Sequence, residues 1–332
     1  MTNSLTIAIP TFNGEPYIKD ALKSIFSQSL NNFNIVISDD CSTDNTLKVI
    51  KQFKDKRIKI FQNKKNLGYG KNLQVLRKKI NADIIFLMGQ DDILLKHALK
   101  KTYLPFIKDK SLGIVARSYY WFDKDILKPV RITAPYDWKN NKTVFILDNK
   151  KVIKKFFEST AQLSGVAFRN NLTKIDFHPD TFTAHVYPLA DISKKAKICF
   201  LKDFTVAVRI SSSQTRSIGK IYNKSPLQSW VDMVNKIYPE QKYKLVKKVR
   251  IKQIATHYLG LIQIKNFGKF YQLLREIYYH LKYYPLSCLR PDFLLISLGA
   301  IFLPKKLLLW LTDNFKNKVL TNFLIKKTNE QI

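Results

Sequence analysis

The chain has 332 residues, 45% of them hydrophobic, and carries a formal net charge of +32 at pH 7. The hydrophobic content excludes a disordered chain, and the length allows one large domain or a domain with a substantial appendage. The charge exceeds what solubility requires, so we expect an anionic partner, for which nucleic acid and anionic lipid both qualify.

The first 90 residues alternate between short apolar runs and apolar residues at helical spacing. We expect strands at 5–9, 33–37, 57–61 and 84–88, and helices at 17–30, 45–53 and 71–80. This alternation predicts an α/β fold with a mainly parallel sheet flanked by helices. The carboxyl ends of the strands should meet at one edge, where open α/β sheets bind their ligands.

Polar residues follow the predicted strands at this edge. The unbroken apolar run 84–88 leads to Asp91 and Asp92, which by themselves would fit a strand-end turn or a helix cap. The loops after the other strands add Thr11, Asn13, Asp39, Asp40, Asn66 and Lys71. Carboxylates, a cation and a pair able to bind a metal suit a nucleoside diphosphate. The sequence has no Gly-x-Gly-x-x-Gly after the first strand and no P-loop pattern, so a dinucleotide site and a P-loop site both lack their main support.

Four motifs in order resemble the nucleotide-sugar glycosyltransferases of family 2, which have the GT-A fold. They are Ile7 to Asn13, Ser38 to Asp44, Asn66-Leu67-Gly68 and Gln90-Asp91-Asp92, and they cover roughly the first 125 residues. Residues 164–169 and 182–187 look like the abequosyltransferase-like enzymes of surface-polysaccharide synthesis. The resemblance implies a hexosyltransferase-type enzyme that inverts the anomeric carbon.

The resemblance also implies a role for each matching position. Asp92 would hold Mg²⁺ or Mn²⁺ on the diphosphate, and Asp91 would bind the donor sugar or ribose. Lys71 replaces a common arginine, which keeps the charge but loses the bidentate fork. Gln90 replaces the first Asp of the acidic triplet and leaves the metal fewer carboxylates, so weaker metal binding is expected. The residues expected to line the nucleotide sugar are Pro10, Thr11, Phe12, Asn13, Glu15, Asp40, Asn66, Lys71 and Asp91.

A catalytic base should lie on the acceptor side of such a site. The family usually supplies an Asp from an acidic pair, and this chain has no such pair in the corresponding stretch. The candidates are His185, then Asp180, then Asp191. A hydrogen-bonded structural histidine or a metal ligand is an equally good interpretation of His185.

The middle of the chain is less regular. We expect a strand at 112–116, and a helix followed by a strand within 156–168. The aromatic residues 119–122 would be either core or a stacking surface for an acceptor sugar. The predicted domains are a GT-A domain at 1–215, divided into a nucleotide-sugar half (1–125) and an acceptor half (126–215), and a basic helical region at 216–332.

The C-terminal part changes in character. From Thr205 onward there are 22 Lys and Arg against 6 Asp and Glu, and residues 293–303 carry no charge. That run is about half as long as a bilayer span. Apolar runs with aromatic residues and lysines favour helices lying in an anionic membrane interface. A buried helical hairpin or a dimer surface would also explain them.

The cysteines and the N-terminus indicate the compartment. Cys41, Cys199 and Cys288 show no paired spacing, which fits a reducing cytosol, and residues 1–4 lack the features of a signal peptide. We therefore expect a cytoplasmic enzyme, peripheral on the cytoplasmic face of the cell membrane, that moves a sugar to a lipid-linked or oligosaccharide acceptor.

Two rival functions remain at this stage. A nucleotidyltransferase also uses carboxylates on such a sheet, but it should have a Gly-rich basic loop after the first strand, where this chain has Thr11-Phe12-Asn13-Gly14. A nucleic-acid-binding protein would explain the charge alone. No nucleic-acid-binding module is recognisable, so no nucleic-acid partner is expected.

Overall fold

The computed structural model describes residues 4–212 and 219–314. The described residues fall into two compact units, of which the first comprises 4–122 and 132–209 and the second 123–131 and 210–314. The predicted domain boundary at 215/216 and the end of the predicted basic region, 315–332, lie outside the described residues.

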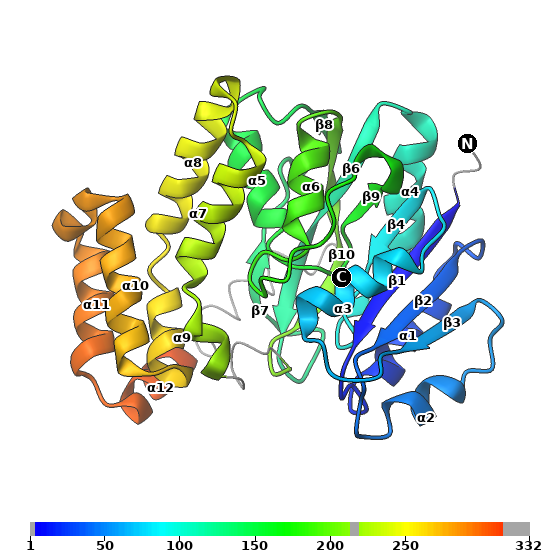
Figure 1. Cartoon of the computed structure of the whole chain (residues 1–332), viewed down its shortest axis with the longest axis horizontal. Coiled ribbons are helices and arrows are strands. Elements are labelled where there is room, and N and C mark those ends of the chain that lie inside the picture. Colours follow the sequence, from blue (N-terminus) through cyan, green and yellow to red (C-terminus); the bar gives the residue numbers. More distant parts are fainter. Residues whose placement is uncertain (1–3, 213–218, 315–332) are drawn as a thin grey trace. The chain divides into compact units, whose positions relative to one another are not determined.

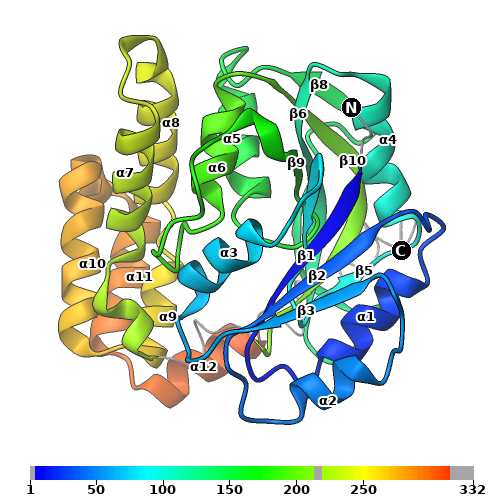
Figure 2. The ribbon, with the colours of Figure 1, turned by 45° about the vertical axis from the view of Figure 1, so that its right-hand side comes forward.

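The first half of the first unit contains the predicted alternation of strands and helices. The elements are β1 (Leu5–Thr11), α1 (Ile18–Phe26), β2 (Asn34–Asp39), α2 (Thr46–Lys51), β3 (Ile58–Gln62), α3 (Tyr69–Lys78) and β4 (Ile84–Leu87). Strands β1 to β4 pair in parallel in the order β3-β2-β1-β4. Helix α3 lies on one face of these strands, and α1 and α2 lie on the other (Figure 2).

Helix α1 ends earlier than the pattern predicts. The apolar spacing continues to Leu30, but the helix stops at Phe26. The side chains of Ser27 and Gln28 donate hydrogen bonds to the carbonyl of Ser24, at 3.0 and 3.1 Å. Such bonds to nearby backbone compete with the helix and end it.

The second half of this unit makes the sheet mixed. Its elements are β5 (Ile93–Leu94), α4 (Ala98–Lys108), β6 (Leu112–Phe122), β8 (Lys142–Val144), α5 (Lys150–Ser159), β9 (Ala167–Arg169), η1 (Asn170–Leu172), α6 (Val186–Ser193) and β10 (Lys197–Arg209), while β7 (Pro129–Thr133) crosses the boundary between the units. Strand β9 lies antiparallel between β4 and β6, and β10 continues the sheet parallel to β6. This is the GT-A-like α/β architecture (Figure 1).

The middle of the sheet is its most buried part. All residues from Ile84 to Met88 are inaccessible to solvent, as expected for a strand covered on both faces. Strand β6 extends beyond the predicted 112–116 to Phe122, and its aromatic residues 119–122 are buried. These residues therefore belong to the core, which was one of the two interpretations of the aromatic run.

The register brings the strand ends to one edge. Thr11 lies opposite Asp39, and Asp39 lies opposite Gln62 across the next ladder. On the other side of β1, Leu87, the last residue of β4, pairs with Ala8, so β4 ends three residues before the end of β1. The loops after β1, β2, β3 and β4 therefore start from the same edge of the sheet.

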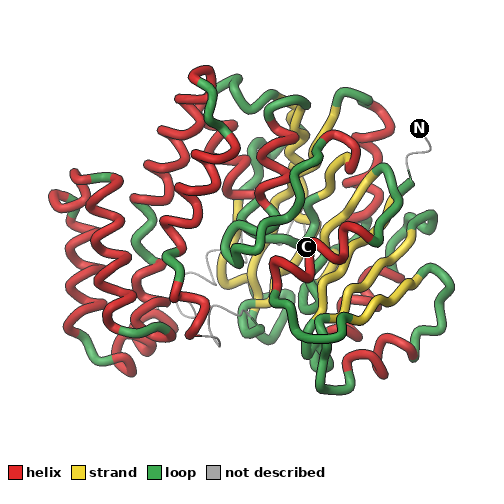
Figure 3. The backbone as a smooth tube through the Cα atoms, viewed as in Figure 1, coloured by secondary structure: helices red, strands yellow, loops and turns green. Residues whose placement is uncertain are grey.

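The second unit is helical (Figure 3). Its elements are η3 (Gly219–Asn223), α7 (Pro226–Ile237), η4 (Gln241–Tyr243), α8 (Lys244–Ala255), α9 (Gly260–Phe267), α10 (Phe270–Tyr283), η5 (Pro285–Leu289), α11 (Pro291–Phe302) and α12 (Lys305–Asn314). Within residues 4–212 and 219–314, no helix is long and apolar enough to span a bilayer.

Candidate active site

Asp40 joins the end of β2 to the loop that precedes α3. Its buried carboxylate accepts hydrogen bonds from Asn63 Nδ2 at 2.8 Å, Leu67 N at 2.9 Å and Gly68 N at 2.8 Å. Gly68 has φ of +83°, a left-handed conformation that glycine adopts without strain. Because a carboxylate has about four acceptor positions, one remains for a ligand such as a nucleobase.

The loop after β1 is held to the loop after β4 by Gln90. The Gln90 amide oxygen accepts from Phe12 N at 2.9 Å and from the Thr11 hydroxyl, while its Nε2 donates to Phe12 O at 3.1 Å. A carboxylate could accept these bonds but could not donate to the Phe12 carbonyl. The amide at this position of the acidic triplet therefore fixes the geometry of the edge.

The loops after β1 and β2 are also joined to each other. Asn13 Oδ1 accepts from Thr43 N at 2.9 Å, and Asn13 N donates to Ser42 Oγ at 2.9 Å. Both carboxylate oxygens of Glu15 accept from Asn45, at the start of α2. Asn13 and Glu15 thus hold the two loops together, which places Pro10 to Phe12 beside the end of β2.

Asn66 and Lys71 are exposed at the entrance to α3. The Asn66 side chain accepts from Gly68 N at 2.9 Å, which shapes the turn before the helix. Lys71 lies in the first turn of α3 with its side chain in solvent. Asn66 therefore lies in the loop that Asp40 holds in place, and Lys71 lies in the first turn of the helix that follows it.

Three oxygen atoms converge above Gly89, just after β4. A Cβ atom at this position would lie 3.0 Å from each of Asp91 Oδ1, Asp92 Oδ2 and Ser164 Oγ. The Ser164 hydroxyl donates to Asp92 Oδ2 and accepts from Gly89 N at 2.7 Å. Only glycine leaves this space open, so the close approach of the two carboxylates depends on it.

Arg209, at the end of β10, completes the support of the carboxylate pair. Its backbone N donates to Asp92 Oδ1 at 2.9 Å, and its Nε donates to the carbonyl oxygen of Asp91 at 3.1 Å. Burial and the neighbouring Asp91 charge raise the pKa of Asp92 to about 7. A cation bound at the pair would relieve both effects.

The residues present fit a divalent ion that is shared with a ligand. Within the described parts of the chain, no three His, Cys, Asp or Glu side chains form a set able to hold a metal alone. Mg²⁺ is commonly bound through one or two carboxylates, water and substrate phosphates. Asp92, with Asp91 beside it, supplies that kind of partial site, and burial followed by the Asp91 charge raises the pKa of Asp92.

His185 lies in the same neighbourhood through Tyr69, which sequence reasoning did not assign. Tyr69 OH is 3.5 Å from His185 Nδ1, and burial, followed by the charges of Asp91 and Asp92, raises the pKa of the tyrosine. His185 Nε2 donates to Thr160 O at 2.8 Å, so Nδ1 carries the lone pair. Burial lowers the pKa of His185 to about 4, which keeps the ring neutral.

The other two base candidates have defined partners. Asp180 is buried in the loop before α6, where its Oδ1 accepts from Phe182 N at 2.9 Å. Asp191, on α6, accepts from Thr173 Oγ1 and from Lys195 Nζ, both at 2.7 Å. The hydrogen bond from Thr173 gives Asp191 a role in holding α6 to the preceding loop.

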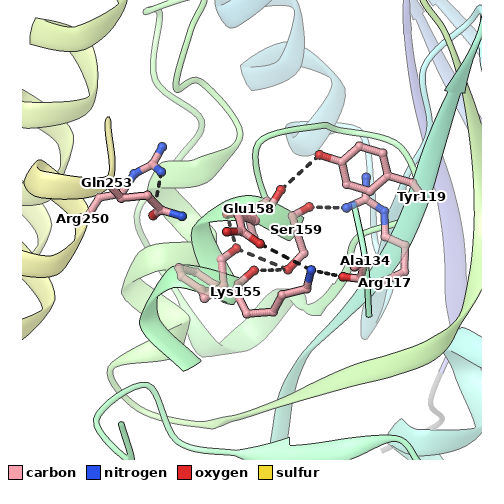
Figure 4. A network of polar contacts seen from close by, with 10 residues as sticks. Arg117, Tyr119, Ala134, Lys155, Glu158, Ser159, Arg250 and Gln253 are labelled. Atoms are coloured by element: carbon pink, nitrogen blue, oxygen red, sulfur yellow. Dashed lines mark hydrogen bonds and ion pairs between the residues drawn. The ribbon is translucent and has the colours of Figure 1, made fainter. Parts of the chain in front are cut away.

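A buried arginine organises the backbone at the end of α5, and sequence reasoning missed it. Arg117 donates to the carbonyls of Ser159 and of Gln162, the latter at 3.1 Å, and Tyr119 OH donates to Glu158 O at 3.1 Å (Figure 4). These carbonyls lie at and just after the end of α5, where helical partners run out. A lone arginine within the apolar run 112–122 was the available signal.

The mixed sheet with its flanking helices has the GT-A type of architecture. The family model described as glycosyl transferase family 2 matches residues 6–164. The chain therefore carries a family 2 glycosyltransferase domain, and the matched segment runs from β1 to the Ser164 that contacts Asp92.

Proteins with similar sequences agree with this class. An uncharacterized glycosyltransferase of Haemophilus influenzae is 24% identical over 298 residues, covering 83% of this chain and 85% of that protein. The poly(ribitol-phosphate) beta-N-acetylglucosaminyltransferase TarS of Staphylococcus aureus is 33% identical over 99 residues, which cover 29% of this chain and 17% of that protein.

Solved structures agree with the fold. TarS 1–349 in complex with UDP-GlcNAc has a TM-score of 0.59 at 18% identity, covering 99% of this chain and 92% of that chain. The mannosyltransferase PcManGT from Pyrobaculum calidifontis, in complex with GDP-Man and Mn²⁺, has a TM-score of 0.56 at 14% identity, covering 90% and 87%. At these identities the likeness establishes the GT-A fold, as the sequence predicted.

Proposed function

We propose that this glycosyltransferase moves a hexose from a nucleoside diphosphate to a hydroxyl of a lipid-linked or growing surface glycan, with inversion at the anomeric carbon. The observation that carries the proposal is the convergence of Asp91, Asp92 and Ser164 above Gly89, on the strand edge that also ends in Asp40. The UDP-GlcNAc and GDP-Man complexes of the two structural neighbours support a nucleotide-sugar donor.

In the proposed reaction, the acceptor oxygen bonds to the anomeric carbon as the bond from that carbon to the donor phosphate oxygen breaks. The electron pair of the broken bond leaves with the nucleoside diphosphate, and the acceptor proton passes to a protein base. When bound, Mg²⁺ or Mn²⁺ offsets the negative charge on the departing diphosphate. Asp92 would hold the ion, Asp91 would bind the sugar or ribose, and Asp40 would bind the nucleobase.

We assign the base to His185 Nδ1, with Asp180 and then Asp191 as alternatives. The hydrogen bond from Nε2 to Thr160 fixes the tautomer, so the lone pair of Nδ1 faces Tyr69 near the carboxylates. Asp191 ranks last because Lys195 already neutralises it. The substitutions His185→Gln, Asp180→Asn and Asp191→Asn separate the three: loss of the base should lower kcat by about 100-fold or more, with small changes for the other two.

We further propose that the enzyme binds its acceptor at the surface of the cell membrane. Residues 219–314 contain 16 Lys and Arg against 5 Asp and Glu, which suits the anionic cytoplasmic face of a cell membrane. A polyprenyl diphosphate acceptor would be held at that surface and carries negative charge itself.

The proposal is tested with a panel of nucleotide sugars in the presence of Mn²⁺. Donor hydrolysis and thermal stabilisation are measured for the wild-type protein, for Asp92→Ala and for Asp203→Ala, which removes a surface partner of Lys101. We expect one donor to be hydrolysed by the wild type and by Asp203→Ala, and metal-dependent binding to disappear in Asp92→Ala. Unchanged turnover by Asp92→Ala would defeat the assignment of the metal carboxylate.

A further inference from the structure

Helix α11 is apolar around its whole circumference. Phe293, Ser297 and Ala300 form the face that is buried within the second unit, yet Leu295 is 77% exposed and Phe302 is 76% exposed on the other side. A helix that is hydrophobic all round normally lies inside a large core or a membrane. With 12 residues, α11 is too short to span a bilayer, so its outer face requires a different apolar environment.

The elements on either side of α11 extend the exposed apolar surface. In η5, Leu289 is 75% exposed, and in α12 the side chain of Trp310 is 61% exposed. Figures 1 and 2 both show α10 and α11 lying side by side in the second unit. The apolar docking surface comprises Leu286, Leu289, Leu294, Leu295, Leu298, Phe302, Leu307, Trp310 and Leu311.

Cations stand at both ends of α11. Lys305 and Lys306 are exposed at the start of α12, directly after the helix. Arg290 lies before its first turn and is paired at 2.8 Å with Asp292, the only acidic residue of the helix. Apolar residues flanked by lysine and accompanied by tryptophan are typical of helices that lie at the surface of an anionic bilayer.

We propose that the apolar docking surface inserts into the interfacial layer of an anionic membrane, with Lys305 and Lys306 at the headgroups. A second copy of the chain fits less well, because a symmetric contact would bring the same cations of both copies to one interface. The inference rests on the proposed function in one respect: membrane binding would bring the enzyme to its lipid-linked acceptor. Binding to lipid itself is independent of the sugar-transfer reaction.

The main experiment is vesicle flotation of the full-length chain carrying Leu295→Ser and Phe302→Ser. The vesicles are phosphatidylcholine alone, or phosphatidylcholine with an equal part of phosphatidylglycerol. We expect the wild type to float with the mixed vesicles and the double variant to bind them at least roughly tenfold more weakly, because two large apolar side chains no longer enter the bilayer. The matched control, Leu104→Ser with Phe145→Ser, removes two exposed apolar side chains of the first unit and should bind like the wild type.

A second pair of variants tests the charge. Lys305→Gln with Lys306→Gln should weaken binding to the mixed vesicles by roughly fivefold per lysine and leave binding to pure phosphatidylcholine unchanged. The control is Lys78→Gln with Lys79→Gln, an exposed adjacent pair in which Lys79 lies over Phe61 as Lys305 lies over Phe267.

Three outcomes would overturn the proposal. The first is that the wild type fails to float, and the second is that the double serine variant binds as well as the wild type. The third is that this variant is monomeric where the lipid-free wild type is a dimer. The last result would identify the surface as an interface between copies. Donor hydrolysis without vesicles is measured in parallel: its absence in the wild type would count against the proposed function, and flotation would still be readable.

Discussion

The two units of this protein depart from the usual burial of side chains in different ways. The first unit buries charged and polar groups, among them Asp40, Asp92 and Arg117, each with partners inside the same unit. The second unit exposes large apolar side chains such as Leu295 and Phe302. Both sets are exceptions to the usual rule that charged groups face solvent and large apolar side chains face the core.

The two units differ in whether the partner of the unusual side chain lies inside the folded chain or outside it. A buried carboxylate or guanidinium is stable only when hydrogen-bond partners are present in the folded chain, so these groups should respond to loss of an internal partner. An exposed leucine has no such partner to lose. Substitutions should therefore reduce the stability of the first unit and the external binding of the second, and the following predictions test that contrast in order of expected size.

The largest effect is expected for Arg117→Met. The variant leaves the carbonyls of Ser159 and Gln162 without their buried donor, and we expect the free energy of unfolding to fall by about 3 kcal/mol. Urea unfolding measures it. Lys101→Met, which removes an exposed ion pair with Asp203, should cost less than about 1 kcal/mol. Equal losses for the two variants would contradict the importance of burial.

Asp40→Asn should lower the free energy of unfolding by about 2 kcal/mol. The Asp40 carboxylate accepts from three N–H donors, and an amide in its place would present an NH2 group to some of them. The melting temperature of the variant, followed by near-UV circular dichroism, reports the loss. Asp203→Asn is the matched control on the surface and should melt close to the wild type. If Asp40→Asn melts like that control, the loop before α3 does not depend on this carboxylate.

Acid should destabilise the protein in part through His185. Its pKa is lowered to about 4 in the folded chain from an ordinary value of 6.5, so the unfolded chain binds more protons between these values and stability falls as pH falls through them. Between about pH 7 and about pH 5.5, the wild type should lose about 1 kcal/mol more than His185→Gln. Urea unfolding at each pH gives this difference. A difference that stays constant with pH would show that His185 is not buried in its neutral form.

The smallest effect is expected for Leu295→Ser. The free energy of unfolding should change by no more than about 0.5 kcal/mol, since the side chain is already in water. Phe293→Ala, two positions away on the buried face, should lower the free energy of unfolding by about 3 kcal/mol. Guanidinium titration of both variants measures the two changes. A large loss for Leu295→Ser would break the comparison, because it would reveal an internal partner for the exposed face.

Local patterns in the sequence determined much of the first unit. Continuous apolar runs predicted β1 to β4, helical spacing predicted α1 to α3, and the order of these elements implied parallel pairing. Polar residues after each run then identified the loops that start from one sheet edge. These features depend on neighbours a few positions apart, so a single sequence contains them.

The tertiary structure decided what depends on residues far apart in the chain. Ser164 and Arg209 reach Asp92 from 72 and 117 positions away, and no local pattern indicates such a contact. The same holds for the carbonyls that Arg117 binds and for the insertion of β9 between β4 and β6. The apolar residues of α11 were evident in the sequence, but only packing determined which of them face the core and which face solvent, because both faces have the same chemistry.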